Sequence, residues 1–371
     1  MHDAAASWMM TTLDNSPFMI ALVQTATMLP MFLLSLPSGA IADRVDRRRL
    51  LIATQTWMTL CAAVLGVLTW ELGHEMRPWI LLLLTLLMGI GNAMTAPAWQ
   101  AIVPELVQKS DVPSAVALGG ISFNLSRIAG PALGGIAAAK LGPGAVFLLN
   151  AVSFLCVVGV LISWRREKQP APPESLWRSI RSGIDYARQE PGMRTIIIRA
   201  SGTVFFGSAS FSLFAAMAKS EFSVDGTGYG TLLGCLGVGA VLGGIFVPRL
   251  RERFSNNTLI GVGVAGVVLQ IIGMAAIRSL PLIALIMLGG GLAWTLVMLT
   301  FNITILHLAP VHLRSRALSI FLLTFTGAIT LGSAFWGIVA TNFGLVNALL
   351  YAASGLFVAM IVLSRFRIAD N

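Results

Sequence analysis

The sequence predicts an all-α polytopic membrane protein built from two pseudo-symmetric six-helix bundles. Of its 371 residues, 56% are hydrophobic and only 11% are charged, whereas soluble domains carry about 45–50% apolar and about 25% charged residues. Long uncharged apolar runs recur along the chain, and one polar linker divides them into two similar sets. This composition excludes a water-soluble globular enzyme and a disordered chain, because so few charges cannot cover a core of that size.

Transmembrane helices account for most of the chain. A helix that crosses a bilayer needs roughly 20 mainly apolar residues, and by this criterion the sequence contains eleven complete spans. The uncharged stretch 317–364 is too long for one helix, so we divide it at the turn-like Asn342-Phe343-Gly344. The predicted spans are 18–41, 50–70, 79–99, 113–138, 145–164, 195–218, 229–249, 258–277, 281–306, 317–340 and 345–364.

A shorter apolar segment, residues 1–13, precedes the first complete span and ends at the turn-like Asp14-Asn15-Ser16-Pro17. It is too short to cross a bilayer alone, and it lacks the basic start and the small-residue cleavage site of a secretory signal peptide. We therefore expect a half-span, the remainder of a truncated first helix, in a fold of twelve helices. The alternative is that a chain lacking this half-helix is a transport-inactive fragment.

Basic residues cluster on one side of the predicted membrane. The net charge of +9 would also suit a nucleic-acid-binding protein, but the Lys and Arg residues lie almost entirely in short loops between apolar runs. Twenty fall on the side of the polar linker and the C-terminus, and four fall on the other side: Arg77, Lys140, Lys219 and Arg278. Because cytoplasmic loops carry the excess of positive charge, we expect a cytoplasmic C-terminus and no nucleic-acid partner.

The longest polar stretch, residues 165–193, predicts a cytoplasmic linker between an N-terminal bundle, 1–164, and a C-terminal bundle, 194–371. It contains the proline-rich segment Gln169-Pro170-Ala171-Pro172-Pro173, a composition typical of linkers. Apolar residues then recur at helical spacing between arginines, at Leu176, Trp177, Ile180, Ile184 and Tyr186. This pattern indicates an amphipathic helix on the inner leaflet, and a solvated helix without lipid contact fits it equally well.

Positions in the two bundles correspond at a nearly constant offset. The offsets fall between 202 and 206 residues, for Pro104 with Pro310, Ala115 with Ala317, Gly130 with Gly332, and Leu141-Gly142 with Phe343-Gly344. The arginine-rich loop that follows Gly39 also has a weak echo at residues 244–253. Two similar halves are the layout of many secondary transporters, whose binding site lies between the halves.

The loop after the 18–41 span reads Gly39-Ala40-Ile41-Ala42-Asp43-Arg44-Val45-Asp46-Arg47-Arg48-Arg49. It resembles the signature loop of the major facilitator superfamily, Gly-x-x-x-Asp-Arg-x-Gly-Arg-Arg, with Asp46 in place of the usual glycine. Together with residues 36–39 and 97–106, it resembles the enterobactin-exporter-like branch, the transmembrane secretion effectors. The resemblance covers nearly the whole chain and implies the major facilitator fold, a monomer, a small-molecule substrate and a bacterial inner membrane.

This loop predicts a conformational latch. A glycine allows close helix approach, an aspartate can accept hydrogen bonds at a helix N-terminus, and arginines can pair with a carboxylate. By resemblance, the aspartate would contact the start of the 317–340 helix in the outward-facing state. The alternative is that the arginines only set topology. The latch residues are Gly39, Asp43, Arg44, Arg47, Arg48 and Glu105.

The 113–138 span contains Gly130-Pro131-Ala132-Leu133-Gly134-Gly135. This run is similar to the end of a motif found in antiporter branches of the superfamily, with Ser126 where a further glycine is usual. Pro131 frees a backbone carbonyl, and Gly130, Gly134 and Gly135 let a neighbouring helix come close. The resemblance implies export, and a purely structural kink is the alternative.

Asp3 and Arg127 are the candidate proton-coupling pair. Arg127 lies deep inside a complete span, where an arginine costs about 2.5–3.5 kcal/mol on insertion scales and therefore needs a partner. Asp3 lies about 15 Å of helix before Leu13, which gives it a similar depth. A structural ion pair without proton exchange is the alternative. Many antiporters of the superfamily carry an arginine in the span equivalent to 79–99, and this chain does not. Proton coupling is therefore implied by the resemblance alone.

Four predicted helices, 1–13, 79–99, 195–218 and 281–306, line the central cavity in proteins with this layout. They carry aromatic and Met side chains with a few amides, which suit an amphipathic organic substrate such as a siderophore, a drug or a metabolite. The candidate cavity residues are Trp8, Met10, Asn92, Met94, Phe205, Phe211, Trp294, Met298 and Asn302.

Motifs for other chemistries do not occur in the sequence. Cys61, Cys156 and Cys235 lie singly in apolar runs without a neighbouring His, so we expect neither a metal nor a disulfide. A Walker loop and hydrolase motifs are absent from the sequence, so we expect no ATP drive, no cofactor and no enzyme activity. The prediction is a secondary transporter that exports a small amphipathic molecule in exchange for protons; an importer of the same superfamily is the alternative.

Overall fold

The computed structural model describes residues 1–102, 106–108, 110–164, 184–310 and 313–366. Within some helices it describes the backbone but not every side chain, and those of Asp43, Arg44, Arg127 and Pro131 lie outside the description. The described elements are all helical. They are α1 (His2–Leu13), α2 (Pro17–Arg44), α3 (Arg47–Leu72), η1 (Gly73–Glu75), α4 (Pro78–Ile102), α5 (Val112–Leu141), α6 (Pro143–Ser163), α8 (Pro191–Ser212), α9 (Phe214–Ser220), α10 (Gly226–Arg251), α11 (Asn256–Ala276), α12 (Leu280–Leu308), α13 (Arg314–Phe343) and α14 (Leu345–Leu363).

The helices follow the predicted apolar spans in order, and α1 coincides with the predicted half-span. Ten helical stretches in the described part are long and apolar enough to cross a membrane. The predicted span 195–218 lies within one of these stretches, Pro191–Ser220, and the helix is interrupted at Leu213, between α8 and α9. Ser208 and Ser210, just before the break, donate their hydroxyls to carbonyls three residues earlier. Such bonds bend helices.

Two glycines reverse the chain at equivalent places in the two parts of the sequence. Gly142 separates α5 from α6 with φ 83° and ψ 154°, and Gly344 separates α13 from α14 with φ 87° and ψ 155°. Because side chains other than glycine rarely adopt this φ, each position favours glycine strongly. The division predicted at Asn342-Phe343-Gly344 is confirmed, and the matching geometry supports the internal repeat.

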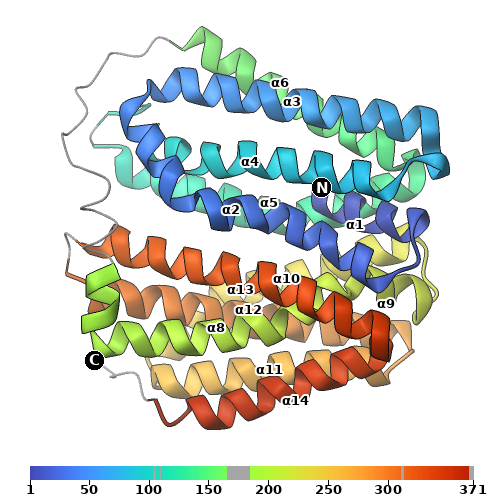
Figure 1. Ribbon diagram of the computed structural model, residues 1–371. Coiled ribbons are helices and arrows are strands. Elements are labelled where there is room, and N and C mark those ends of the chain that lie inside the picture. The colour runs from blue at the N-terminus through green and yellow to red at the C-terminus, as the bar shows by residue number, and fades with distance from the viewer. Residues whose placement is uncertain (103–105, 109, 165–183, 311–312, 367–371) are drawn as a thin grey trace.

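The helices form two groups, as Figure 1 shows. Helices α1–α6 pack mainly among themselves, and so do α8–α14, while the pairs α2–α13 and α5–α10 join the groups. We call α1–α6 the N-half and α8–α14 the C-half. The end of the molecule where α6 stops and α8 starts is called the linker end, and the opposite end, where α1 stops, is called the far end.

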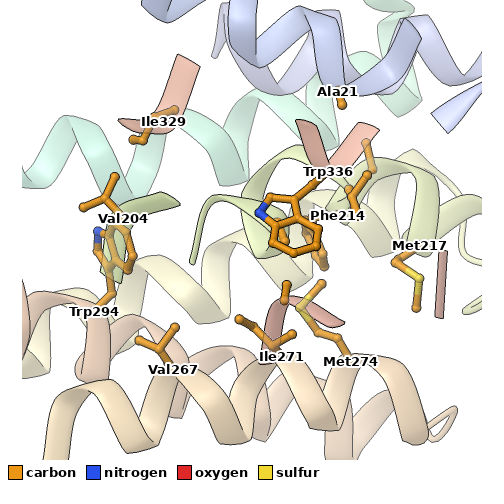
Figure 2. Packing of buried hydrophobic residues seen from close by; sticks show 14 of the residues in the cluster. Ala21, Val204, Phe214, Met217, Val267, Ile271, Met274, Trp294, Ile329 and Trp336 are labelled. Atoms are coloured by element: carbon orange, nitrogen blue, oxygen red, sulfur yellow. The ribbon is translucent and has the colours of Figure 1, made fainter. Parts of the chain in front are cut away.

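The largest hydrophobic cluster continues from the N-half into the C-half. It includes Met9 and Ala21 from α1 and α2 together with buried residues of α8–α14. Figure 2 shows the indole of Trp336 and the ring of Phe214 directed into the same apolar space, with Trp294 further along the C-half. The two halves therefore share a core at their junction.

Candidate functional site

The first seam between the halves runs along α2 and α13. A Cβ atom added to Gly337 would lie 3.1 Å from the Cα atom of Phe18, so glycine permits this close approach. The backbone N–H of Phe18 donates to the hydroxyl of Thr341 over 3.1 Å. The hydroxyl of Thr25 donates to the carbonyl of Thr330 over 3.4 Å. These contacts hold the far-end parts of the two helices together.

The second seam runs along α5 and α10 and uses the glycines of the antiporter-like run. A Cβ atom on Gly135 would lie 2.9 Å from the backbone nitrogen of Gly230 and nearer still to its Cα atom. A Cβ atom on Gly134 would lie 2.7 Å from the Cα atom of Met1, and one on Gly130 would lie 3.4 Å from the Met1 nitrogen. The close approach expected of these glycines is present, and it involves both α1 and the opposite half.

A third set of contacts ties α1 to α9 and α10 at the far end. The rings of Trp8 and Tyr229 stack with centroids 5.3 Å apart, and Phe214 meets the same Tyr229 ring at 5.3 Å. The ammonium of Lys219 donates a hydrogen bond to the carbonyl of Thr11. Thr11 lies in the last turn of α1, where carbonyls have no partner in the helix and the dipole is negative. A lysine is therefore well suited to that position.

The linker end of α2 is packed differently from its far end. A Cβ atom added to Gly39 would meet no atom of the described residues within 4 Å. The close helix approach expected at Gly39 stays a prediction, because several neighbouring side chains lie outside the described residues. The described contacts between α2 and α13 run from the far end to about the middle of both helices, where a Cβ atom added to Gly327 would lie 2.7 Å from the Phe32 ring.

The latch loop is only partly within the described residues. Arg48 donates from Nε to the carbonyl of Leu161 and from a terminal nitrogen to that of Ile162, each over 2.6 Å. These bonds place Arg48 at the C-terminus of α6, where unpaired carbonyls and a negative dipole attract a cation. The expected pairing with a carboxylate stays a prediction, because Glu105 lies outside the described residues. Asp46, which replaces the usual glycine, accepts a hydrogen bond from the Arg49 N–H and caps α3.

The remaining latch residues are only partly described. Arg47 interacts with another residue. The side chains of Asp43 and Arg44, and the whole of Glu105, lie outside the described residues. The contact predicted between Asp43 and the start of α13 therefore stays a prediction.

Asp3 faces the space between the halves. Its side chain is exposed, and its carboxylate lies within electrostatic range of the Tyr229 phenol on α10. The neighbouring His2 points the other way and packs on Phe147 of α6, with ring centroids 5.1 Å apart. Arg127 precedes Gly130 by three residues, or about 4.5 Å along α5, and its side chain lies outside the described residues. The pairing of Asp3 with Arg127 stays a prediction.

Some of the predicted cavity residues meet one another or the opposite helix. Phe211 and Trp294 form an edge contact with centroids 4.8 Å apart. Phe205 contacts the rings of Phe335 and Trp336 on α13, and the indole N–H of Trp336 donates to the Phe205 carbonyl over 2.9 Å. Aromatic side chains of α8, α12 and α13 therefore pack against one another, and Trp294 and Trp336 are buried in the core. Their role as a substrate surface stays a prediction.

Other predicted cavity residues are placed differently. Met10 is fully buried in the core, and Met94 packs on the cluster that contains Leu51 of α3 and Leu161 of α6. Both belong to helix packing in this conformation, because spacing along a helix does not tell which neighbour each face will meet. Asn92, Met298 and Asn302 keep exposed area.

Sequence reasoning missed several residues of this region. Tyr229, Lys219 and Gly230 contribute to the far-end contacts, and the spacing of Gly226, Gly228 and Gly230 was a signal for close packing. Arg199 falls within the predicted span 195–218, but its role was not predicted; it lies in α8.

Arg199 is buried and donates to the side-chain oxygen of Asn257 over 2.7 Å. Asn257 lies in the first turn of α11, so this bond joins α8 to α11 inside the C-half. No group of three or more potential metal ligands occurs in the described part of the chain.

Sequence comparisons relate this chain to known proteins. Residues 1–371 match the sequence family described as transmembrane secretion effector. The staphyloferrin A transporter of Staphylococcus aureus is 25% identical over 92% of this chain and 85% of its own length. The multidrug efflux pump Tap of Mycolicibacterium fortuitum is 25% identical over 85% of this chain and 79% of its own length.

Solved structures share the fold at low sequence identity. A mutant form of the nucleoside transporter NupG superposes with a TM-score of 0.79 at 13% identity, over 98% of this chain and 94% of its own. A bacterial homologue of the iron transporter ferroportin, solved in an inward-facing state, gives 0.72 at 17% identity over 98% and 95%.

Proposed function

This chain belongs to the transmembrane secretion effector family of the major facilitator superfamily, and we propose that it exports a small amphipathic molecule in exchange for protons. It is a multi-pass transporter of a bacterial membrane. In the proposal the linker end faces the cytoplasm, which the uneven distribution of Lys and Arg supports. The efflux pump among its relatives supports the outward direction.

The observation that carries the proposal is the one-sided closure of the two halves. Seams at Gly135–Gly230 and Gly337–Phe18 join them toward the far end, while a Cβ atom on Gly39 at the linker end would meet no atom of the described residues within 4 Å. A substrate would enter from the linker end, and the far-end seams would then separate as the halves rock. The latch around Asp43 would form in that second state.

Proton exchange is assigned to Asp3. Its carboxylate is exposed and lies beside Tyr229, a residue of the far-end contacts. Protonation of the Asp3 carboxylate would change its electrostatic interaction with Tyr229. Proton uptake would thereby be coupled to opening of the far end. One charge moved across the membrane supplies about 2.3 kcal/mol per 100 mV, enough for more than tenfold accumulation. Export against a gradient is thus within reach of a single proton.

The substrate surface is assigned to aromatic and soft apolar groups of the C-half. Phe211 contacts Trp294, and Phe205 contacts Trp336. Met298 and Asn302 lie one turn apart on α12 and keep exposed area, and the Asn302 amide donates to the Met298 carbonyl. Flat rings and a thioether adapt to varied organic shapes.

A disulfide across the far end tests alternating access. In a variant with Cys61, Cys156 and Cys235 replaced by serine, Phe18→Cys and Thr341→Cys introduce cysteines at two positions where the backbone nitrogen of one and the side-chain oxygen of the other are 3.1 Å apart. Oxidation should stop efflux of a panel of amphipathic fluorescent dyes from preloaded cells, and a reductant should restore it. A protonophore should stop efflux by the reduced protein.

The matched control joins two helices of the same half. The hydroxyls of Thr54 on α3 and Thr95 on α4 are 2.9 Å apart, so Thr54→Cys with Thr95→Cys provides a comparable crosslink that crosses no seam. Oxidation of this pair should leave efflux unchanged. Efflux that continues with the far-end pair fully crosslinked would refute alternating access at this end.

A further inference from the structure

A cavity of about 380 Å³ opens at the linker end of the C-half, between the end of α10, the start of α11 and the end of α12. Arg251, Glu252 and His307 line it, and none of the three has a hydrogen-bond or ion-pair partner among the described residues. Glu252 and His307 are exposed and Arg251 is partly buried, so charged groups of both signs are accessible at this cavity and suit a ligand that carries both charges. We propose that this cavity binds the zwitterionic head group of a phospholipid with a primary ammonium, of the phosphatidylethanolamine class.

Some of the lining groups suit a phosphate. The Arg251 guanidinium offers paired donors that match phosphate oxygens, and His307 offers a ring nitrogen. The cavity also borders Asn256, the first residue of α11. The N-terminus of a helix carries positive partial charge and favours an anion. Three independent groups therefore favour negative charge at this place.

Other lining groups suit an ammonium. The Glu252 carboxylate accepts hydrogen bonds and donates none. Leu308, the last residue of α12, also lines the cavity, and the C-terminus of a helix favours a cation. A simple anion would leave Glu252 unpaired, whereas a head group with both charges satisfies Arg251 and Glu252 together.

The surroundings of the cavity favour a lipid over a soluble metabolite. Along the last turns of α10, Ile245 and Phe246 are exposed, as expected for side chains in contact with acyl chains. The next residues toward the linker end include Arg249 and Arg253, which are exposed and charged. This change from apolar to basic surface marks the level of lipid head groups, and Ile303 gives the cavity an apolar wall.

Occupancy would also contact the segment that precedes α8. The Tyr186 hydroxyl donates to the Leu308 carbonyl over 3.1 Å, and a Cβ atom added to Gly192 would lie 3.0 Å from the Leu308 side chain. Leu308 is thus shared by the cavity and by the start of the C-half. A bound head group would stabilise this junction.

Lipid retention by the purified full-length protein tests the proposal. Native mass spectrometry and thermal unfolding would be measured in detergent with added phosphatidylethanolamine, phosphatidylcholine or phosphatidylglycerol. We expect the wild-type protein to retain phosphatidylethanolamine best, because the methylated ammonium of phosphatidylcholine cannot donate to Glu252 and phosphatidylglycerol has no ammonium. Equal retention of the three lipids would overturn the proposal.

Three variants locate the site. Arg251→Gln should lower retention of all three lipids by about tenfold, as expected for the loss of a charge-assisted contact. Glu252→Gln should remove the preference for phosphatidylethanolamine and leave total retention similar. Arg253→Gln is the matched control, because Arg253 lies in the same loop outside the cavity lining, and it should change neither.

Two further outcomes would refute the proposal. If Arg251→Gln and Arg253→Gln lower retention equally, binding is a general effect of surface charge. If soluble phosphoethanolamine competes as well as the lipid, the ligand is a free metabolite. His307→Gln, measured beside the lipid-free melting temperature, separates loss of binding from loss of folding. None of these readouts depends on transport.

Discussion

Replacement of Gly135 by alanine should favour the state in which the far end is open. In the present conformation the new methyl group would lie 2.9 Å from the Gly230 nitrogen and closer to its Cα atom. Carbon atoms in good contact stay about 3.5–4.0 Å apart, so α5 and α10 would have to separate by about 1 Å. The obstacle is backbone, which cannot turn aside as a side chain can.

The size of the effect follows from the cost of overpacking. Extra methyl groups in a packed core typically cost about 1–3 kcal/mol. Here the cost falls on the closed far end and is relieved when the halves separate. A difference of 1–3 kcal/mol shifts a two-state equilibrium by about 5–150-fold.

Thiol labelling at the far end measures this shift. Thr11 is buried in the closed state, with 1% of its surface exposed, so Thr11→Cys in a background without other cysteines reports opening. A membrane-impermeant maleimide should label it about 5–150-fold faster when Gly135→Ala is present.

The control places the same kind of clash within one half. In Gly266→Ala the added Cβ would lie 2.6 Å from the Ala293 Cβ, between α11 and α12. It should lower the melting temperature without a change in labelling. Equal labelling by the two variants would show that the α5–α10 seam does not distinguish the states.

Four more substitutions test separate contacts. Arg199→Ala should lower the free energy of unfolding by about 1.5–3 kcal/mol through loss of its bond to Asn257, measured by denaturant titration, while exposed Arg194→Ala should not. Lys219→Met removes the donor to the Thr11 carbonyl and should speed labelling of Thr11→Cys; Lys140→Met, also exposed near the far end, should have no effect. Asp3→Asn should remove the dependence of efflux on the proton gradient, and unchanged pH dependence would contradict its assigned role. Burial, with a smaller contribution from Glu190, raises the pKa of Tyr186. The phenol and its bond to Leu308 should therefore persist below about pH 10, and the stability they add should be lost as pH rises through the raised pKa. Tyr186→Phe should abolish that alkaline change in melting temperature.

The spans and turns were predictable because they depend on local properties. Hydrophobic length marks a membrane helix wherever it occurs, and Gly142 and Gly344 mark chain reversals that favour glycine. The glycine run in α5 likewise predicted close packing, because residues without bulky side chains let two helix backbones approach.

Contacts between distant segments were harder to predict. Met10 and Met94 share residue type and helical spacing with the other cavity candidates, yet Met10 is fully buried in the core shared by the two halves and Met94 packs against a cluster of the N-half. The partner of Arg48 is a helix terminus, which becomes an acceptor only once α6 has ended beside it. The interruption at Leu213 follows two serines whose hydroxyls donate to backbone carbonyls three residues earlier, and the sequence does not show which carbonyl a serine hydroxyl will bind.

The glycines at the seams have a consequence for the speed of movement. Where Gly135 meets Gly230 and Gly337 meets Phe18, at least one surface has no side chain to interlock. Separation of the halves there requires no rotamer change by the glycines, and closure freezes no torsion in them, so little side-chain entropy is lost. The seams therefore keep the halves in close contact while adding little side-chain barrier to their separation.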